Sequence, residues 1–292
     1  MVRRLCLATT LGFLFGIAAI GVAQEDYLDI LVVKVEPGKR AAFDAAAKKV
    51  ADANRRNHGD TWIAMETVYG AQNTVTMVST RRSYADIDKG YELFYGAMTQ
   101  SYGPSATTKI LQDFTATTES SRGEVRRRRW DLSANVPADP AATMKLVGES
   151  RWIRTTIVHV RPGQVLRFEE QVRTVKEAAE KSNPGWSNLV SQAVAGQKGM
   201  VYYISFLAKS LSDFDNLPAL PQILGAEGYK KFMASSTETV ESSETVINHF
   251  VPEISNPPEA VVSASPDFWK PKPAAVKPKS ADAGKTEAKE KK

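Results

Sequence analysis

Two stretches of the chain share one pattern of hydrophobic and polar positions. Each is a short apolar run that ends at a Pro-Gly pair, residues 30–35 before Pro37-Gly38 and residues 157–160 before Pro162-Gly163. Short runs rich in valine and isoleucine that stop at a turn signal are typical of buried strands. After each pair, apolar residues recur at spacings of three and four, starting at Phe43 and Phe168, which predicts an amphipathic helix. The same strand, turn and helix are therefore predicted twice.

The two stretches stay in step further along the chain. The matched strands are residues 74–79 with 200–205 and residues 125–132 with 247–254. Trp62 is matched with Trp186, a recurrence that favours core packing over a role in chemistry. The order in each stretch is β-α-β-β-α-β, the split βαβ or ferredoxin-like unit. We therefore predict an α+β protein with two tandem ferredoxin-like repeats.

The opening Val-x-Pro-Gly-x4-Phe, at Val35 to Phe43 and Val160 to Phe168, resembles the dimeric α+β barrel superfamily. That superfamily includes the antibiotic-biosynthesis monooxygenase-like and NIPSNAP-like domains. The resemblance covers about residues 27–133 and 151–256, and it implies that two units face their sheets together to close a barrel, here within one chain. Some members are cofactor-free monooxygenases or degrade haem. The Asn, Trp and His set of the haem-degrading branch finds no match here, so no cofactor is predicted.

The N-terminal residues have the pattern of a secretory signal peptide. Arg3 and Arg4 precede an apolar stretch over residues 5–22, and small residues up to Ala23 allow cleavage before Gln24. We predict a signal peptide at 1–23 and a secreted or periplasmic protein; the alternative is an uncleaved anchor. Cys6 is the single cysteine, so the mature chain has no disulfide.

The remaining boundaries follow from composition. We predict repeat 1 at 24–133, a linker at 134–150, repeat 2 at 151–256, and a disordered Pro/Ala/Lys tail at 257–292. Of the formal charge of +5, the leader carries +2 and the tail +3, so the predicted folded part is neutral. No nucleic-acid partner is predicted, because the basic pI comes from the ends. The lysine-rich tail either contacts an anionic envelope surface or is a solvated spacer.

Standard catalytic and metal motifs are missing. The three histidines, His58, His159 and His249, have no paired ligand spacing, so no metal is predicted. No Gly-x-Ser-x-Gly elbow and no phosphate-binding glycine loop occur. The sequence leaves open whether the protein is an enzyme.

The arginine run 126–129 lies on the predicted last strand of repeat 1. Alternation sends Arg126 and Arg128 to one face, and Arg127 and Arg129 to the other. The ordinary interpretation is a charged edge strand that resists aggregation. The alternative is an arginine buried in a barrel, which would need an anion.

Four basic or titratable residues lie on strands that are neighbours in a ferredoxin-like unit. His159 and His249 lie on the first and last strands of repeat 2, and the matching positions in repeat 1 are Lys34 and Arg127. If they face inward, they line a pocket for a carboxylate or another anionic ligand, and the histidines are able to transfer protons. The alternative is that they lie at strand ends and contact water.

Three functions are compatible with the sequence. The first is non-catalytic binding of a small anionic or aromatic ligand in the barrel. The second is a cofactor-independent monooxygenase-like enzyme, and the third is a structural or stress-related envelope protein. The sequence gives no oligomeric state.

Overall fold

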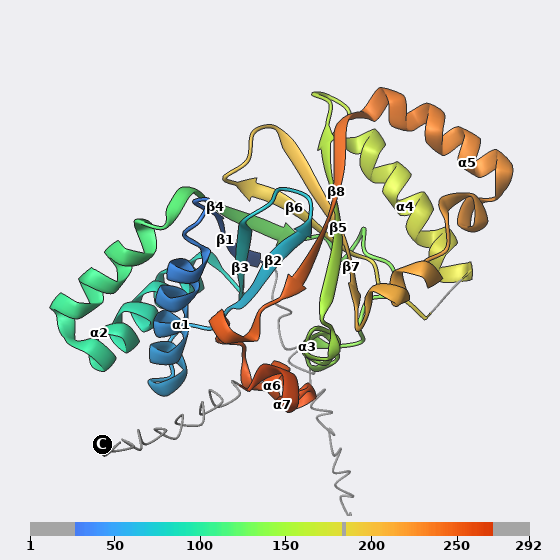
Figure 1. Cartoon of the computed structure of the whole chain (residues 1–292). Coiled ribbons are helices and arrows are strands. Elements are labelled where there is room, and N and C mark those ends of the chain that lie inside the picture. The colour runs from blue at the N-terminus through green and yellow to red at the C-terminus, as the bar shows by residue number, and fades with distance from the viewer. Residues whose placement is uncertain (1–26, 183–184, 271–292) are drawn as a thin grey trace, which may run out of the picture.

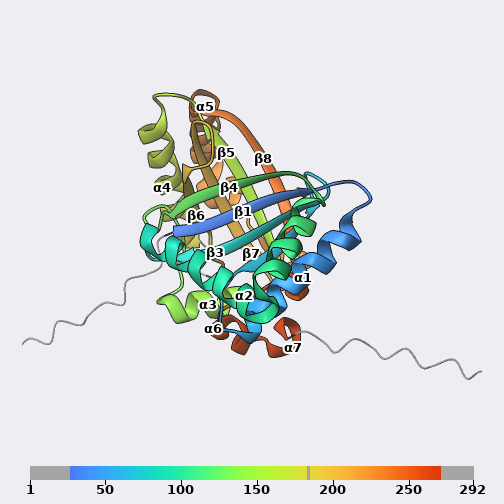
Figure 2. The same cartoon turned by 90° about the vertical axis from the view of Figure 1, so that its left-hand side faces the viewer.

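The protein is built around one closed barrel of eight antiparallel strands (Figures 1 and 2). The computed structural model describes residues 27–182 and 185–270; the predicted signal peptide lies outside these ranges. The first half comprises β1 (Tyr27–Val35), α1 (Arg40–Arg56), β2 (Ile63–Tyr69), β3 (Thr74–Arg81), α2 (Tyr84–Thr115) and β4 (Thr118–Arg128). The second half comprises β5 (Trp152–Val160), α4 (Val165–Ser182), β6 (Leu189–Ala195), β7 (Met200–Ala208), the 3₁₀ turn η1 (Leu211–Asn216), α5 (Leu220–Thr239) and β8 (Val240–Phe250).

Each half contributes four neighbouring strands to the barrel. The order around the barrel is β1-β3-β2-β8-β5-β7-β6-β4, so the halves join where β2 pairs with β8 and where β4 pairs with β6. Helices α1 and α2 lie on the outer side of the first half, and α4 and α5 on the outer side of the second (Figure 1). The predicted α+β barrel within one chain is confirmed at this level: every strand has two neighbours.

The repeated Pro-Gly pairs form the turns that were predicted. Gly38 and Gly163 have φ values of +82° and +79°, in the left-handed region that glycine enters without steric cost. Each turn directs a helix back onto the sheet it has just left. Phe43 of α1 is 0% exposed and Phe168 of α4 is 5% exposed, which anchors each helix to its half of the core.

β4 is not an edge strand. It pairs with β1 over its length and with β6 at its C-terminal end, so the interpretation of the arginine run as a charged edge is wrong. A closed barrel leaves no edge to protect. The alternation of the run does hold, and it sends Arg126 into the interior of the barrel.

The predicted linker and the beginning of the predicted tail are folded. The linker contains α3 (Pro140–Glu149), which begins at an N-cap where the Asp139 side chain accepts a hydrogen bond from the Ala142 N–H at 2.7 Å. After the 3₁₀ turn η2 (Pro252–Ile254) come α6 (Glu259–Ala264) and α7 (Pro266–Trp269). The prediction of disorder is therefore wrong for residues 257–270, and the rest of that tail lies outside the described residues.

These short helices close one end of the barrel. In Figure 1 α3, α6 and α7 lie together below the strands. Trp269 is 1% exposed, and its indole N–H donates to the Gly148 carbonyl of α3 at 2.8 Å. The prediction of disorder rests on the average composition of residues 257–292. An average does not reveal that one residue, Trp269, is buried against α3. No helix within the described residues is long and apolar enough to cross a membrane.

Trp62 and Trp186 are not equivalent in the structure. Trp62 directly precedes β2, and the residue that directly precedes β6 is Asn188. Both stand at isolated bridges, Trp62 to Asn256 and Asn188 to Ala134. Trp186 lies two residues earlier, at the place that Asp60 occupies in the first half.

Candidate functional site

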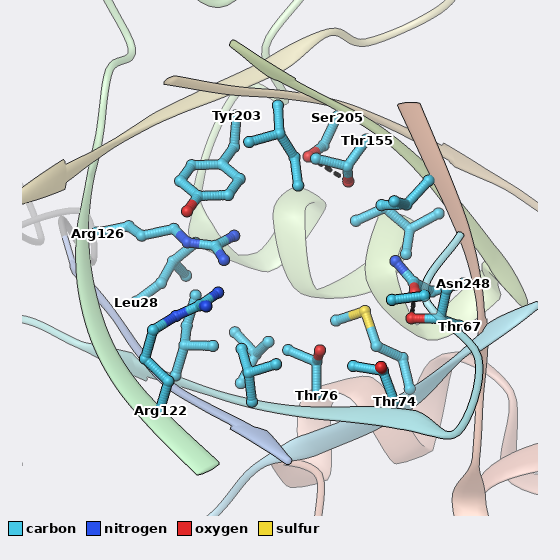
Figure 3. Close-up of a pocket in the computed structure, with 18 of the residues that line it drawn as sticks. Leu28, Thr67, Thr74, Thr76, Arg122, Arg126, Thr155, Tyr203, Ser205 and Asn248 are labelled. Atoms are coloured by element: carbon cyan, nitrogen blue, oxygen red, sulfur yellow. Dashed lines mark hydrogen bonds between the residues drawn. The ribbon is translucent and has the colours of Figure 1, made fainter. Parts of the chain in front are cut away.

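The barrel encloses a cavity of about 610 Å³ that opens at the end opposite α3 (Figure 3). Residues at the open end, such as Ser120, Arg122 and Glu244, are exposed to solvent. All strands of the barrel contribute to the wall, from Leu28 on β1 to Asn248 on β8. The cavity is in the range of small-molecule sites.

Two arginines of β4 share one buried carboxylate. Arg122 and Arg126 each donate to Glu124 through Nε at 2.8 Å. As ion pairs, their Nη2 atoms lie 2.6 Å and 2.7 Å from the carboxylate oxygens. The Glu124 side chain is 0% exposed, whereas both arginines line the cavity. Two positive charges on one negative charge leave the wall with an excess of positive charge. Among the described residues, neither Nη1 atom makes a hydrogen bond, and Figure 3 shows both guanidinium groups in the cavity.

Tyr203 of β7 completes this cluster from the opposite half. The Arg126 guanidinium lies over the Tyr203 ring at 3.3 Å from its centre, a cation–π contact. The Tyr203 hydroxyl donates to Glu124 at 3.0 Å, and Gln197 donates to Glu124 at 2.7 Å. The cluster therefore holds β4 and the β6–β7 turn together across the joint between the halves.

The cluster fixes its own protonation states. Burial by itself raises the pKa of Glu124, but the charges and hydrogen bonds of Arg126 and Arg122 outweigh it, so this pKa lies below its usual value. Burial raises the pKa of Tyr203 to about 12. At neutral pH the carboxylate is charged and the phenol keeps its proton. The group is suited to holding an anion in place and unsuited to taking up a proton from a substrate.

The other walls carry hydroxyl and amide groups that bond to one another. Thr155 and Ser205 lie 3.0 Å apart, and the Thr67 hydroxyl donates to the Asn248 side-chain oxygen at 2.8 Å. Figure 3 marks both bonds. Towards α3 the interior narrows to a further space of about 130 Å³ with largely apolar walls. Its apolar lining includes Leu28, Ile63, Val78, Leu207, Phe250 and Val261. The interior thus has a cationic wall near its open end and an apolar floor.

Among the predicted site residues, Lys34 lines this cavity. It lies near the open end, 3.8 Å from Glu119, and both side chains are nearly half exposed. His159 follows Ile157 on β5 by two residues, so strand alternation places it on the inner side. It lies at the end of its strand, and it is not part of the cavity lining.

Arg127 and His249 lie on the outer side of the barrel. Arg127 follows the inward-pointing Arg126 and is exposed. His249 follows the inward-pointing Asn248, and its ring lies 4.5 Å from that of Trp152. The sequence therefore grouped four residues that the structure does not bring together, because the matching of strands did not establish which face each residue takes. Whether any of them binds a ligand stays a prediction.

The residues that form the cluster are visible in the sequence only in part. Arg122, Glu124 and Arg126 alternate along one strand, which places all three on one face. The alternation would have predicted an ion cluster on one face of the strand. Two of its three residues, Arg122 and Glu124, precede the arginine run 126–129 on which the prediction is based. Tyr203 carries no signal, since its contact with Arg126 depends on barrel closure. Within the described ranges, no group of three or more His, Cys, Asp or Glu residues is arranged to hold a metal ion.

Comparison with known proteins gives the fold and nothing finer. No family model matches the chain, and no curated protein matches it by sequence. An anthrone oxidase-like protein is similar in structure with a TM-score of 0.50 and 14% identity, over 80% of this chain and 94% of that one. Chlorite dismutase from Candidatus Nitrospira defluvii is similar with a TM-score of 0.46 and 10% identity, over 82% of this chain and 95% of that one.

A haem-binding protein from Thermus thermophilus gives a TM-score of 0.45 and 10% identity, over 79% of this chain and 93% of that one. At such low identities the likeness concerns architecture alone. The shared architecture, a closed antiparallel barrel with helices on its outer side, is consistent with the resemblance inferred from the Pro-Gly motifs.

Proposed function

We propose that the barrel cavity binds a small carboxylate whose remaining part is aromatic or apolar. The observation that carries this proposal is the pair Arg122 and Arg126, oriented by the buried Glu124 so that both guanidinium groups reach the cavity. Arginine binds carboxylates through directed, charge-assisted hydrogen bonds. The apolar floor supplies the surface that a ring or short chain would cover.

The test is calorimetric titration of the purified full chain with salicylate, a small aromatic carboxylate. Arg122→Gln removes a half-exposed cation from the wall and is expected to raise the Kd about tenfold, the effect of losing one charge-assisted bond. Arg127→Gln removes a charge from the same strand on its outer side and is expected to leave the Kd unchanged. Equal effects of the two substitutions would reject the cavity as the binding site.

A cofactor-independent oxygenase is the second candidate. It is supported by the fold shared with the anthrone oxidase-like protein, and by nothing in the chemistry of the wall. Tyr203 does not serve as a base at neutral pH, because burial raises its pKa to about 12 and the phenol keeps its proton. An oxygen electrode with anthrone as substrate separates the candidates: the binding proposal expects consumption no faster than in buffer, whereas consumption that Arg122→Gln abolishes would favour the enzyme. A structural role without a ligand would be favoured if the cavity bound neither compound.

We also propose that the two halves are copies of one ferredoxin-like unit and that the protein is exported. Support for the first comes from the common order of strands and helices in the two halves and from the shared Pro-Gly turns. Support for export comes from the N-terminal pattern, which predicts that the mature protein begins at Gln24. N-terminal sequencing of the protein made in a bacterial host tests this. Contact of the lysine-rich tail with an anionic envelope surface belongs to the same proposal.

A further inference from the structure

We infer that a second site, outside the barrel, binds an apolar chain that ends in a carboxylate. The site is the cavity of about 860 Å³ between α4, α5 and the outer face of the sheet formed by β8, β5, β7 and β6, called here the outer cavity. It is larger than the space inside the barrel. The outer cavity is separate from the cavity inside the barrel, because the sheet lies between the two.

The outer cavity exists because α5 does not pack its apolar side chains onto the sheet. Of the residues of α5, Thr239 alone is buried. α5 is fastened to α4 by polar contacts: the Gln171 amide donates to the Phe232 carbonyl at 2.9 Å and to the Ser236 hydroxyl at 2.6 Å. The apolar lining comes from both sides: Val158, Val172 and Ile204 at the surface of the core between α4 and the sheet, and Leu220, Ile223 and Phe232 of α5. Such walls suit an apolar molecule.

One end of the outer cavity has polar groups without partners. The Trp186 indole N–H and the Asn188 side-chain oxygen are buried and make no hydrogen bond within the described residues. Asn188 is 8% exposed and lines the cavity, as does Trp186. A buried polar atom without a partner is unfavourable, so a ligand that forms hydrogen bonds with these groups gains affinity from them.

A cation lies at the same end. Arg154 of β5 lines the cavity and makes no hydrogen bond or ion pair in the part of the chain that the structure describes. It is paired in register with Phe206 of β7, and the Phe206 ring lies 5.4 Å from the Trp186 ring. On the other side of Phe206 lies Asn188, because the next residue, Leu189, is paired with Ser205. The guanidinium, the indole N–H and the amide of Asn188, whose rotation presents either its N–H₂ or its oxygen, therefore lie around the Phe206 ring at one end of the cavity. Together they match a carboxylate.

The test uses cis-parinaric acid, an 18-carbon fluorescent carboxylate, titrated into the purified full chain. Binding is expected to enhance the probe's emission and to quench the tryptophan emission to which Trp186 contributes. Arg154→Gln is expected to raise the Kd about tenfold, and Trp186→Phe, which keeps the ring and removes the N–H, about threefold. Val175→Trp, which fills the cavity from α4, is expected to abolish binding.

Matched controls separate this site from the barrel. Arg122→Gln and excess salicylate are expected to leave parinaric acid binding unchanged, and Arg154→Gln to leave salicylate binding unchanged. Hexadecanol is expected to compete weakly and palmitate strongly, since the alcohol carries no charge. If Val175→Trp fails to fold, Arg154→Gln decides, because its side chain has no partner to lose. The inference is overturned if parinaric acid does not bind, if Arg154→Gln binds it as the wild type does, or if salicylate displaces it.

Discussion

The two halves of the barrel differ in the size and the polar lining of the space between their helices and their sheet. In the first half this space is about 290 Å³, and Arg81 at its edge binds Asp60 through two hydrogen bonds of 2.7 Å and Asp29 at 3.2 Å. In the second half the space is about 860 Å³. When the two halves are compared by strand register, Arg154 is equivalent to Asp29 and Ala208 is equivalent to Arg81. The second half therefore has no acid at the position of Asp29, and its arginine stands there instead.

The same arrangement of strands and helices thus leaves a small space in the first half and a space about three times as large in the second. In the Arg81 cluster both carboxylates bind the buried guanidinium through its two terminal nitrogens, and its Nε makes no hydrogen bond within the described residues. In the second half Trp186 occupies the position of Asp60, and the cation of Arg154 has no anion among the described residues. The first half thus contains an ion cluster that stabilises the fold. The second half contains polar groups without a bonding partner among the described residues, which we propose to bind a ligand.

The largest effect is expected for Arg81→Met. The substitution leaves two partly buried carboxylates without their cation, which costs about 3 kcal/mol in the free energy of unfolding. Arg154→Met is the matched change in the second half and is expected to cost less than about 0.5 kcal/mol. Urea denaturation measures both. Similar losses from the two substitutions would show that the halves do not differ in this way.

A smaller effect is expected for Glu124→Gln, which tests whether the barrel cluster behaves like the Arg81 cluster. Two arginines lose their shared anion, and the expected cost is about 2–3 kcal/mol at pH 7. The pKa of Glu124 is lower in the folded than in the unfolded protein, so its contribution is complete above the usual carboxyl pKa and is lost as the pH falls through the lower, folded value.

Urea titrations from pH 7 to pH 3 measure this dependence. The difference in stability between wild type and Glu124→Gln is expected to shrink steadily below about pH 5. A difference that stays constant with pH would mean that the glutamate is not the anion that holds the two arginines.

The smallest effect is expected for Gly90→Ala on α2. A Cβ at this position would lie 2.6 Å from Arg81 Nη2, so the guanidinium must shift away from its carboxylates. Crowding of this kind costs about 1–3 kcal/mol, and the low end applies because a side-chain tip moves. In the double substitution with Arg81→Met the penalty of the alanine is expected to vanish. An additive result would show that Gly90 matters for another reason.

Most of the fold could be predicted because its signals are local and occur twice. The Pro-Gly turns, the helices behind them and the strand order follow from spacing and from the left-handed glycines. The closing helices could not be predicted in the same way. Trp269 is surrounded by residues typical of disordered tails, and its burial depends on α3, far away in the sequence.

The candidate site could be predicted in part, namely that basic residues on the strands reach the interior. Lys34 and Arg126 do so. Arg127 and His249 do not, because a shift of one residue along a strand moves a side chain to the other face. The contrast between Arg81 and Arg154 was out of reach, since both look alike until strand pairing shows which neighbours each has.

The joints between the halves have a consequence for how the chain folds. β2 pairs with β8 and β4 pairs with β6 across the joints, so each half alone would have two unpaired edge strands. Contacts between segments so distant in the chain slow folding. While β8 is still being synthesised, the edge of β2 is open to pairing with other molecules. Until the last strand is in place, the growing chain depends on protection from aggregation.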